Sequence, residues 1–176
     1  MPTACFVNQY TLDRTKMALP FGFTNPRDLL GKVERDLSTL DSAIAAQDKS
    51  RIADALYDFS VSITSVKDWL KSHTSSSYTP AEVEAFVAGS VPLSSFRDLA
   101  NANKHRFITR YAPVTHDAMV SALPSIEVAP LRDAPQHPQQ VFRVKIIRAD
   151  GARLEAGALA RAAFEEWKSF MTKHGV

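Results

Sequence analysis

Two apolar seams, separated by a short polar break, constrain the fold of this chain more than any other feature. In the first seam, apolar residues recur at spacings of three and four: Leu30, Val33, Leu37, Leu40 and Ile44. The second seam keeps the same rhythm with Ile52, Leu56, Phe59, Ile63, Val66 and Leu70. This spacing places each set on one face of a helix. Because only Gln47-Asp48-Lys49 lies between them, the two helices are predicted to form an antiparallel hairpin.

Capping residues predict where the helices begin and end. Asn25 is suited to cap the first helix, and either Asp48 or Ser50 the second. Residues 79–82, Thr-Pro-Ala-Glu, match a capping box and predict the start of a short third helix. Residues 89–92, Gly-Ser-Val-Pro, end that helix and begin a fourth, so the first half of the chain is predicted to be helical.

The second half of the chain changes character. Residues 107–111 can form a short strand, and several prolines follow. Residues 141–148 alternate apolar with basic side chains, which is the period of a strand. Asp150-Gly151 is a hairpin-turn signal, and 153–154 is the predicted return strand. A last helix is predicted over 155–173.

These elements predict an α+β fold that is mainly α. Its core is expected to resemble a four-helix bundle, with an appended β-hairpin or small antiparallel sheet and a C-terminal helix. A length of 176 residues fits one domain, 1–176. Within it we expect a helical core at 25–106, a loop and strand region at 107–155, and the C-terminal helix at 156–173.

Composition excludes several classes of protein. A net charge of +2 is too small to indicate a nucleic-acid partner by itself. The single cysteine, Cys5, excludes an internal disulfide, and the histidines are scattered without further ligands at metal-binding spacing. We therefore expect neither a metal nor a cofactor. The start of the chain does not resemble a secretory signal, and no apolar run is long enough to span a membrane, which predicts a cytoplasmic protein.

Chemically capable side chains gather at residues 96–106. At 100° per residue, Arg97, Asn101 and Lys104 form a stripe along the flank of the fourth helix. Asp98 and His105 lie beside this stripe. The apolar face of the same helix carries Phe96, Leu99, Ala100 and Asn103.

This stripe admits two interpretations. In the first, Lys104, His105 and Arg106 are solvated cations that complement the dipole at the end of the helix. Asn101 and Asn103 then belong to a structural network of polar contacts, since asparagine is a mediocre helix former.

In the second interpretation the stripe binds a phosphate. Arg97 can grip a phosphate with two hydrogen bonds, and His105 titrates near neutrality and can transfer a proton. Asp58 of the second helix can pair with Arg97 across the bundle, and Asp68 is an alternative partner. The predicted catalytic residues are Arg97, Asn101 and His105, and the predicted substrate-binding residues are Lys104, Arg106 and Asp58.

The order Arg97, Asn101, His105 late in a helical bundle resembles the HEPN superfamily over residues 25–111. Seven residues separate Arg97 from His105, one more than is usual in that family. Those small helical domains often act as metal-independent ribonucleases in toxin–antitoxin and phage-defence systems, commonly as dimers. The resemblance implies that Arg97 stabilises the phosphate and that His105 is the general base or acid on a ribose hydroxyl of RNA. The stretch Arg-Asp-Leu-Ala-Asn-x-x-Lys-His also resembles one in uncharacterised bacterial proteins.

Two other functions stay open at this point. One is a non-catalytic helical module that binds a protein partner or a second copy through the hairpin at 141–154 or the final helix. The other is a bundle that binds a nucleotide through the same basic stripe. In a nuclease, His105 and Arg97 should line one cleft, whereas in a structural network His105 or its neighbours should be tied to backbone groups away from solvent.

Overall fold

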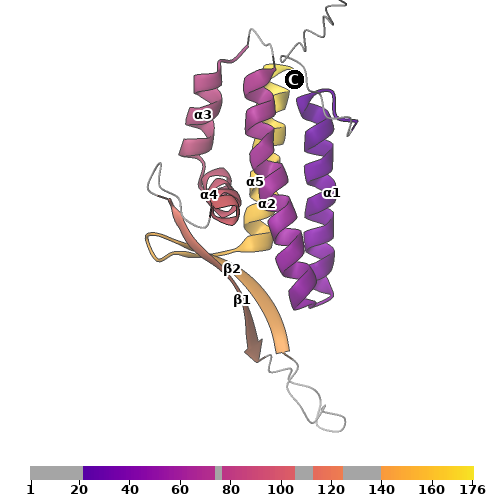
Figure 1. Cartoon of the computed structure of the whole chain (residues 1–176), viewed down its shortest axis with the longest axis vertical. Coiled ribbons are helices and arrows are strands. Elements are labelled where there is room, and N and C mark those ends of the chain that lie inside the picture. Colours follow the sequence, from indigo (N-terminus) through magenta and orange to yellow (C-terminus); the bar gives the residue numbers. More distant parts are fainter. Residues whose placement is uncertain (1–21, 74–76, 106–112, 125–139) are drawn as a thin grey trace, which may run out of the picture.

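The computed structural model describes residues 22–73, 77–105, 113–124 and 140–176, and within these ranges the side chains of Asn103, His105 and several strand residues fall outside the description. The elements are α1 (Pro26–Ala45), α2 (Lys49–Ser72), α3 (Pro80–Gly89), α4 (Val91–His105), β1 (Thr115–Pro124), β2 (Gln140–Arg148), β3 (Arg153–Glu155) and α5 (Ala156–His174). The protein is thus mainly helical with a small antiparallel sheet, which confirms the predicted fold class (Figure 1).

The predicted hairpin of α1 and α2 is present, with its caps. The side chain of Asn25 accepts a hydrogen bond of 3.1 Å from the backbone N–H of Asp28. Of the two caps considered for α2, Asp48 is the one used, and it accepts from the N–H of Arg51 over 3.1 Å. Each cap satisfies a backbone donor that the first turn of a helix leaves unpaired.

The apolar seam of α2 is buried over its whole length, as predicted. The seam of α1 is buried at its centre only, because Leu30 and Ile44 at its two ends are half-buried while Leu29 and Ala43 are buried in their place. A pattern with a period of 3.5 drifts on a helix of 3.6 residues per turn, so the ends of a long seam rotate off the core. This rotation brings Leu30 toward the surface between α1 and α5.

The third and fourth helices follow each other almost without a break. Thr79 and Glu82 form the predicted capping box at the start of α3. Ser90, between the two helices, accepts from the N–H of Leu93 over 2.9 Å and so begins α4. In Figure 1, α4 is seen nearly end-on, because it crosses the direction of the long helices, and its Phe96 packs edge-on against Phe59 of α2.

The last helix, α5, packs within the helical bundle and does not project from it. It lies alongside α1 and α2 (Figure 1). Trp167 is only 1% exposed and sits in the core. Near the other end, Arg161 makes an ion pair of 2.6 Å with Asp41 of α1.

The sheet has the order β1-β2-β3 and is antiparallel throughout. Strand β2 and the return strand β3 confirm the predicted hairpin at Asp150-Gly151. Strand β1, which pairs along nearly all of β2, was not predicted. The strand expected at 107–111 lies outside the described residues. Val144 and Ile146 are buried and hold the sheet against the helices.

Candidate functional site

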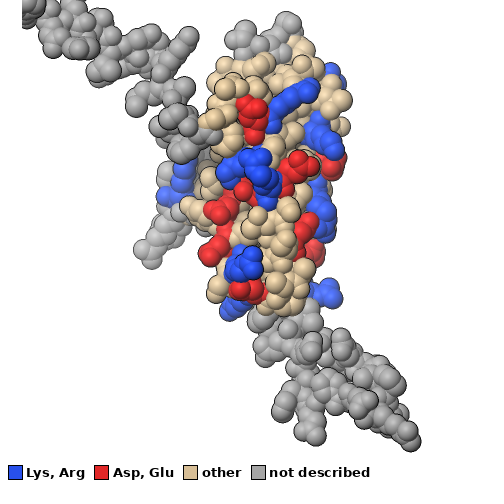
Figure 2. Space-filling model, turned by 90° about the vertical axis from the view of Figure 1, so that its right-hand side faces the viewer, with Lys and Arg blue, Asp and Glu red and all other residues tan. Residues whose placement is uncertain are grey.

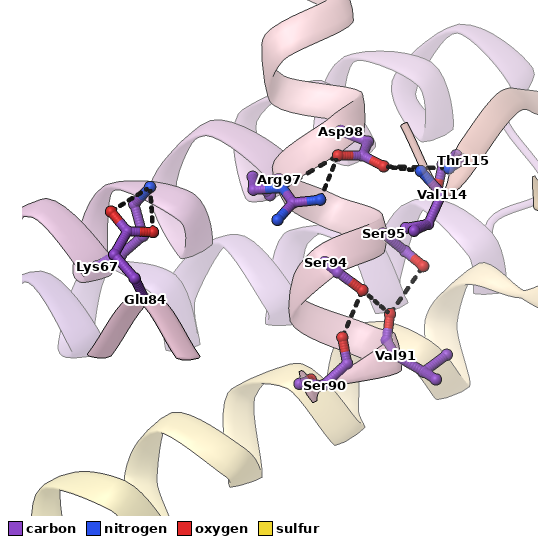
Figure 3. Close-up of polar contacts among 10 residues, drawn as sticks. All are labelled: Lys67, Glu84, Ser90, Val91, Ser94, Ser95, Arg97, Asp98, Val114 and Thr115. Atoms are coloured by element: carbon purple, nitrogen blue, oxygen red, sulfur yellow. Dashed lines mark hydrogen bonds and ion pairs between the residues drawn. The ribbon is translucent and has the colours of Figure 1, made fainter. Parts of the chain in front are cut away.

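The centre of the predicted site is an ion pair between two consecutive residues of α4. Arg97 donates from Nε and Nη2 to Oδ1 of Asp98 over 3.1 and 2.9 Å. The Asp98 side chain is fully buried, and that of Arg97 is 18% exposed. Figure 3 shows the guanidinium turned toward this carboxylate.

The second oxygen of Asp98 holds the start of the sheet. Oδ2 accepts hydrogen bonds from the backbone N–H groups of Val114 and Thr115, the latter over 3.1 Å (Figure 3). A buried carboxylate is tolerated when both its charge and its lone pairs have partners, as they do here. We call this arrangement of Arg97, Asp98 and the two amides the Asp98 clamp. It fastens α4 to the root of β1.

The predicted pairing of Arg97 with Asp58 is wrong. Asp58 is exposed on α2 and makes no ion pair with any residue in the described ranges. The face of α2 that meets α4 is that of Phe59, and the preceding residue is rotated about 100° away from it. Asp68, the alternative partner, is exposed as well.

In the described part of the chain, the Arg97 side chain lines a small cavity. The cavity has a volume of about 10 Å³ and is also lined by Thr64, Lys67 and Trp167. That volume holds at most one water molecule. Lys67 donates to Glu84 over 3.3 Å (Figure 3). The buried Oγ1 of Thr64 has no hydrogen-bond partner among the described residues. The cavity is therefore too small for a nucleotide.

The other predicted site residues are only partly placed. Asn101 is half-buried and Lys104 is exposed on α4. His105 is the last residue of α4, but its side chain is not among those described, and Arg106 lies outside the described residues. The structure therefore brings Arg97 to Asp98, and the proximity of Arg97 to the His105 ring stays a prediction.

A second candidate site is a groove between α1 and α5, which sequence reasoning missed. Its volume is about 350 Å³. The floor is apolar, and charged side chains from both helices form the rim. The lining residues are Arg27, Leu30, Gly31, Glu34, Phe164, Lys168, Met171, Thr172 and Val176. We call this surface the α1/α5 groove.

Two glycines explain where the groove lies. At the far end of the helix pair, a Cβ on Gly157 would come within 3.3 Å of Cδ1 of Ile44, so the helices approach closely there. At the groove, a Cβ on Gly31 would meet only Nη1 of Arg35 at 3.8 Å. A glycine in the middle of a helix lowers its stability, and no packing contact in the described structure requires this one. Gly31 lies within α1, which is continuous from Pro26 to Ala45, so the glycine alone did not indicate a groove in the sequence.

The surface charges do not form a field of one sign on the side of α1. Figure 2 shows Lys and Arg side chains interspersed with Asp and Glu on that face. No cluster of three or more His, Cys, Asp or Glu residues among those searched is arranged to hold a metal ion. In the described part of the chain, no helix has both the length and the apolar character needed to cross a membrane.

The fold and these two sites define a mainly helical α+β protein with a clamped sheet and an open helical groove. Comparisons of the chain with protein-family models, curated proteins and solved structures found no match.

Proposed function

We propose that this chain is a non-catalytic helical module that binds another protein in the cytoplasm. The observation that carries the proposal is the Asp98 clamp. An arginine grips a phosphate best with two neighbouring N–H groups of its planar guanidinium. In this protein Nε and Nη2 of Arg97 already donate to Asp98.

Moving Arg97 out of the clamp has an energetic cost. Removing one partner of a buried ion pair costs about 3–5 kcal/mol, because it leaves an uncompensated charge. Two hydrogen bonds to a phosphate, at about 1.5–3 kcal/mol each, would roughly offset this loss. Transfer of Arg97 from Asp98 to a substrate phosphate would therefore gain little. The clamp matches the structural interpretation of the stripe, in which neighbours of His105 are tied to backbone groups.

The α1/α5 groove supplies the binding surface. Its apolar floor lies between two helices, where partner helices and peptides bind to other proteins. The hydroxyl of Thr172 in its lining donates to the backbone carbonyl of Lys168 over 2.8 Å rather than to a side-chain base, so the groove favours binding over chemistry. The final helix, one of the two partner surfaces considered from the sequence, forms one wall.

A photo-crosslinking residue placed at Thr172 on the groove tests this function in cells that produce the protein. We expect a discrete covalent adduct with one protein. The adduct should disappear in Gly31→Leu, which fills the groove. It should persist in Gly89→Leu on α3, where an added Cβ has no neighbour within 4 Å. A crosslinker at Thr39, an exposed threonine of α1 outside the groove, is the control. Equal adducts from both positions would contradict the proposal.

The ribonuclease activity implied by the family resemblance needs its own assay. Purified wild-type protein and His105→Ala are incubated with single-stranded RNA in the presence of EDTA. We expect no cleavage by either protein. Cleavage by the wild type that is lost in a folded His105→Ala protein would overturn the non-catalytic proposal.

A further inference from the structure

We propose that the partner seated in the α1/α5 groove is a second copy of this chain, which inserts the exposed face of its α2 helix. This inference rests on the proposed function of the groove as a protein-binding surface. Both surfaces that would meet, the exposed face of α2 and the α1/α5 groove, are present on this chain.

The inserting surface is a short face of α2. Two large apolar side chains stand out on it, Tyr57 at 49% exposed and Val61 at 36% exposed. They are two of only three large apolar residues that are exposed in the described structure. Asp54 and Asp58 lie on the same side of the helix, since positions 54, 57, 58 and 61 follow the i, i+3, i+4, i+7 pattern. We call these four residues the α2 ridge.

The α1/α5 groove is complementary to this ridge in polarity. Leu30, Phe164 and Met171 offer an apolar floor for the side chains of Tyr57 and Val61. Burying these exposed side chains against that floor removes apolar surface from water, which is the main driving force of association.

The charges are complementary as well. Arg27 and Lys168 stand on opposite walls of the groove. Arg27 makes no ion pair with a described residue. Lys168 makes a long contact of 3.6 Å with the exposed Glu165, and its Nζ lies 5.9 Å from the centroid of the Phe164 ring. On the ridge, neither Asp54 nor Asp58 is paired with a residue in the described ranges. Glu34 is the single side-chain carboxylate among the groove residues.

Charge also selects how the two copies meet. Two ridges packed against each other would place four carboxylates together, which costs free energy. When the α2 ridge enters the α1/α5 groove, the carboxylates of Asp54 and Asp58 instead lie near Arg27 and Lys168. The contact is therefore between different surfaces. It closes a dimer when each copy fills the groove of the other, and it otherwise builds rings or open chains of copies. One helix face buries less area than a standard stable interface, so association is expected at high protein concentration.

Sedimentation velocity of the full chain between about 10 and 500 µM tests the inference, a range suited to a small interface. The ridge variant carries Asp54→Lys with Asp58→Lys, and the groove variant carries Arg27→Glu with Lys168→Glu. The wild type should sediment faster as concentration rises, while each variant alone should stay monomeric. An equimolar mixture should regain concentration-dependent association. The lysine ridge of one variant attracts the glutamate groove of the other, and the unchanged aspartate ridge attracts the unchanged groove, so the two variants should alternate in the complex.

Asp68→Lys is the control for charge reversal on α2, since it reverses an exposed carboxylate on the same side of the helix, about two turns beyond Val61. It should associate like the wild type, and circular dichroism should show all variants folded. A monomeric wild type at every concentration, association unaffected by the ridge variant, or a mixture that stays monomeric would each overturn the inference. If the adduct formed from Thr172 has the mass of a different protein, this inference fails while the proposed function of the groove stands.

Discussion

The indole Nε1 of Trp167 donates a hydrogen bond of 3.1 Å to the backbone carbonyl oxygen of Ile63. This bond joins α5 to the middle of α2 within the core, where both residues are buried. A buried tryptophan needs a partner for its single N–H group, and here a carbonyl of a neighbouring helix provides it.

Replacement of Trp167 by phenylalanine should lower the free energy of unfolding by about 2–3 kcal/mol, since it removes this bond and leaves a small cavity. Urea denaturation measures the change. Trp69→Phe is the control, because Trp69 is half-buried and makes only an edge contact with Phe23 at 6.3 Å between ring centroids. Similar losses in the two variants would contradict a special role for the Trp167 bond.

The Asp98 clamp predicts a large effect of Asp98→Asn. The amide has almost the same shape, but it removes the charge and turns an N–H group toward other donors. The expected loss is about 3–5 kcal/mol, the cost of breaking a buried ion pair. Asp58→Asn, at an exposed position, should change stability by less than about 0.5 kcal/mol. Urea denaturation and amide exchange at Val114 and Thr115 check the clamp, and protection unchanged in Asp98→Asn would argue against it.

Two glycine substitutions should act in opposite directions. Gly31→Ala should raise the stability of the protein by about 0.5–1 kcal/mol, because alanine favours the helix and its methyl group would make only an ordinary contact of 3.8 Å with Nη1 of Arg35. Gly157→Ala should lower it, since the new methyl group would stand 3.3 Å from Cδ1 of Ile44. The melting temperatures of both variants check this difference between the open surroundings of Gly31 and the close packing at Gly157.

The capping box of α3 predicts a contribution to stability that depends on pH. Hydrogen bonds from the backbone N–H and then the hydroxyl of Thr79 lower the pKa of Glu82 below its ordinary value of 4.5. A carboxylate with a lowered pKa stabilises the fold above its unfolded pKa, and the contribution is lost as pH falls through the folded pKa. The melting temperature should therefore drop below about pH 4.5, and drop less in Glu82→Gln. Identical acid profiles for the two proteins would show that Glu82 contributes nothing.

The buried Tyr78 predicts a change at alkaline pH. Burial raises the pKa of its phenol, which also donates to the carbonyl of Leu70 over 3.2 Å. The neutral phenol favours the folded state fully below the ordinary pKa of 10.0, and this contribution is lost as pH rises through the folded value. Absorbance titration of wild type against Tyr78→Phe should show a tyrosine that ionises later than a free phenol. A difference spectrum with an ordinary midpoint would contradict this expectation.

The parts of the fold that were predicted from sequence depend on neighbours in the chain. The seam of α2, the caps at Asn25 and Asp48, and the turn at Asp150-Gly151 each require only residues a few positions apart. Strand β1 was missed because its residues, Thr115–Pro124, lack a regular alternation, and the strand exists through its pairing with β2.

The candidate site was predicted less well for the same physical reason. The periodicity of α4 predicted the stripe that contains Arg97. It could not show that Asp98 accepts hydrogen bonds from the backbone N–H groups of Val114 and Thr115, because these residues follow the end of the helix. A carboxylate among apolar neighbours was the available signal. The groove depends on α1 and α5, which are far apart in the sequence, so no local pattern indicates it.

The contacts of α5 also have a consequence for the synthesis of the chain. The Trp167–Ile63 bond and the Arg161–Asp41 ion pair join residues 104 and 120 positions apart. On the ribosome, α1 and α2 emerge long before α5 is translated, and their apolar faces then lack one of the helices that cover them. The nascent chain therefore passes through a stage in which it can bind chaperones or aggregate, and this stage ends when α5 leaves the exit tunnel.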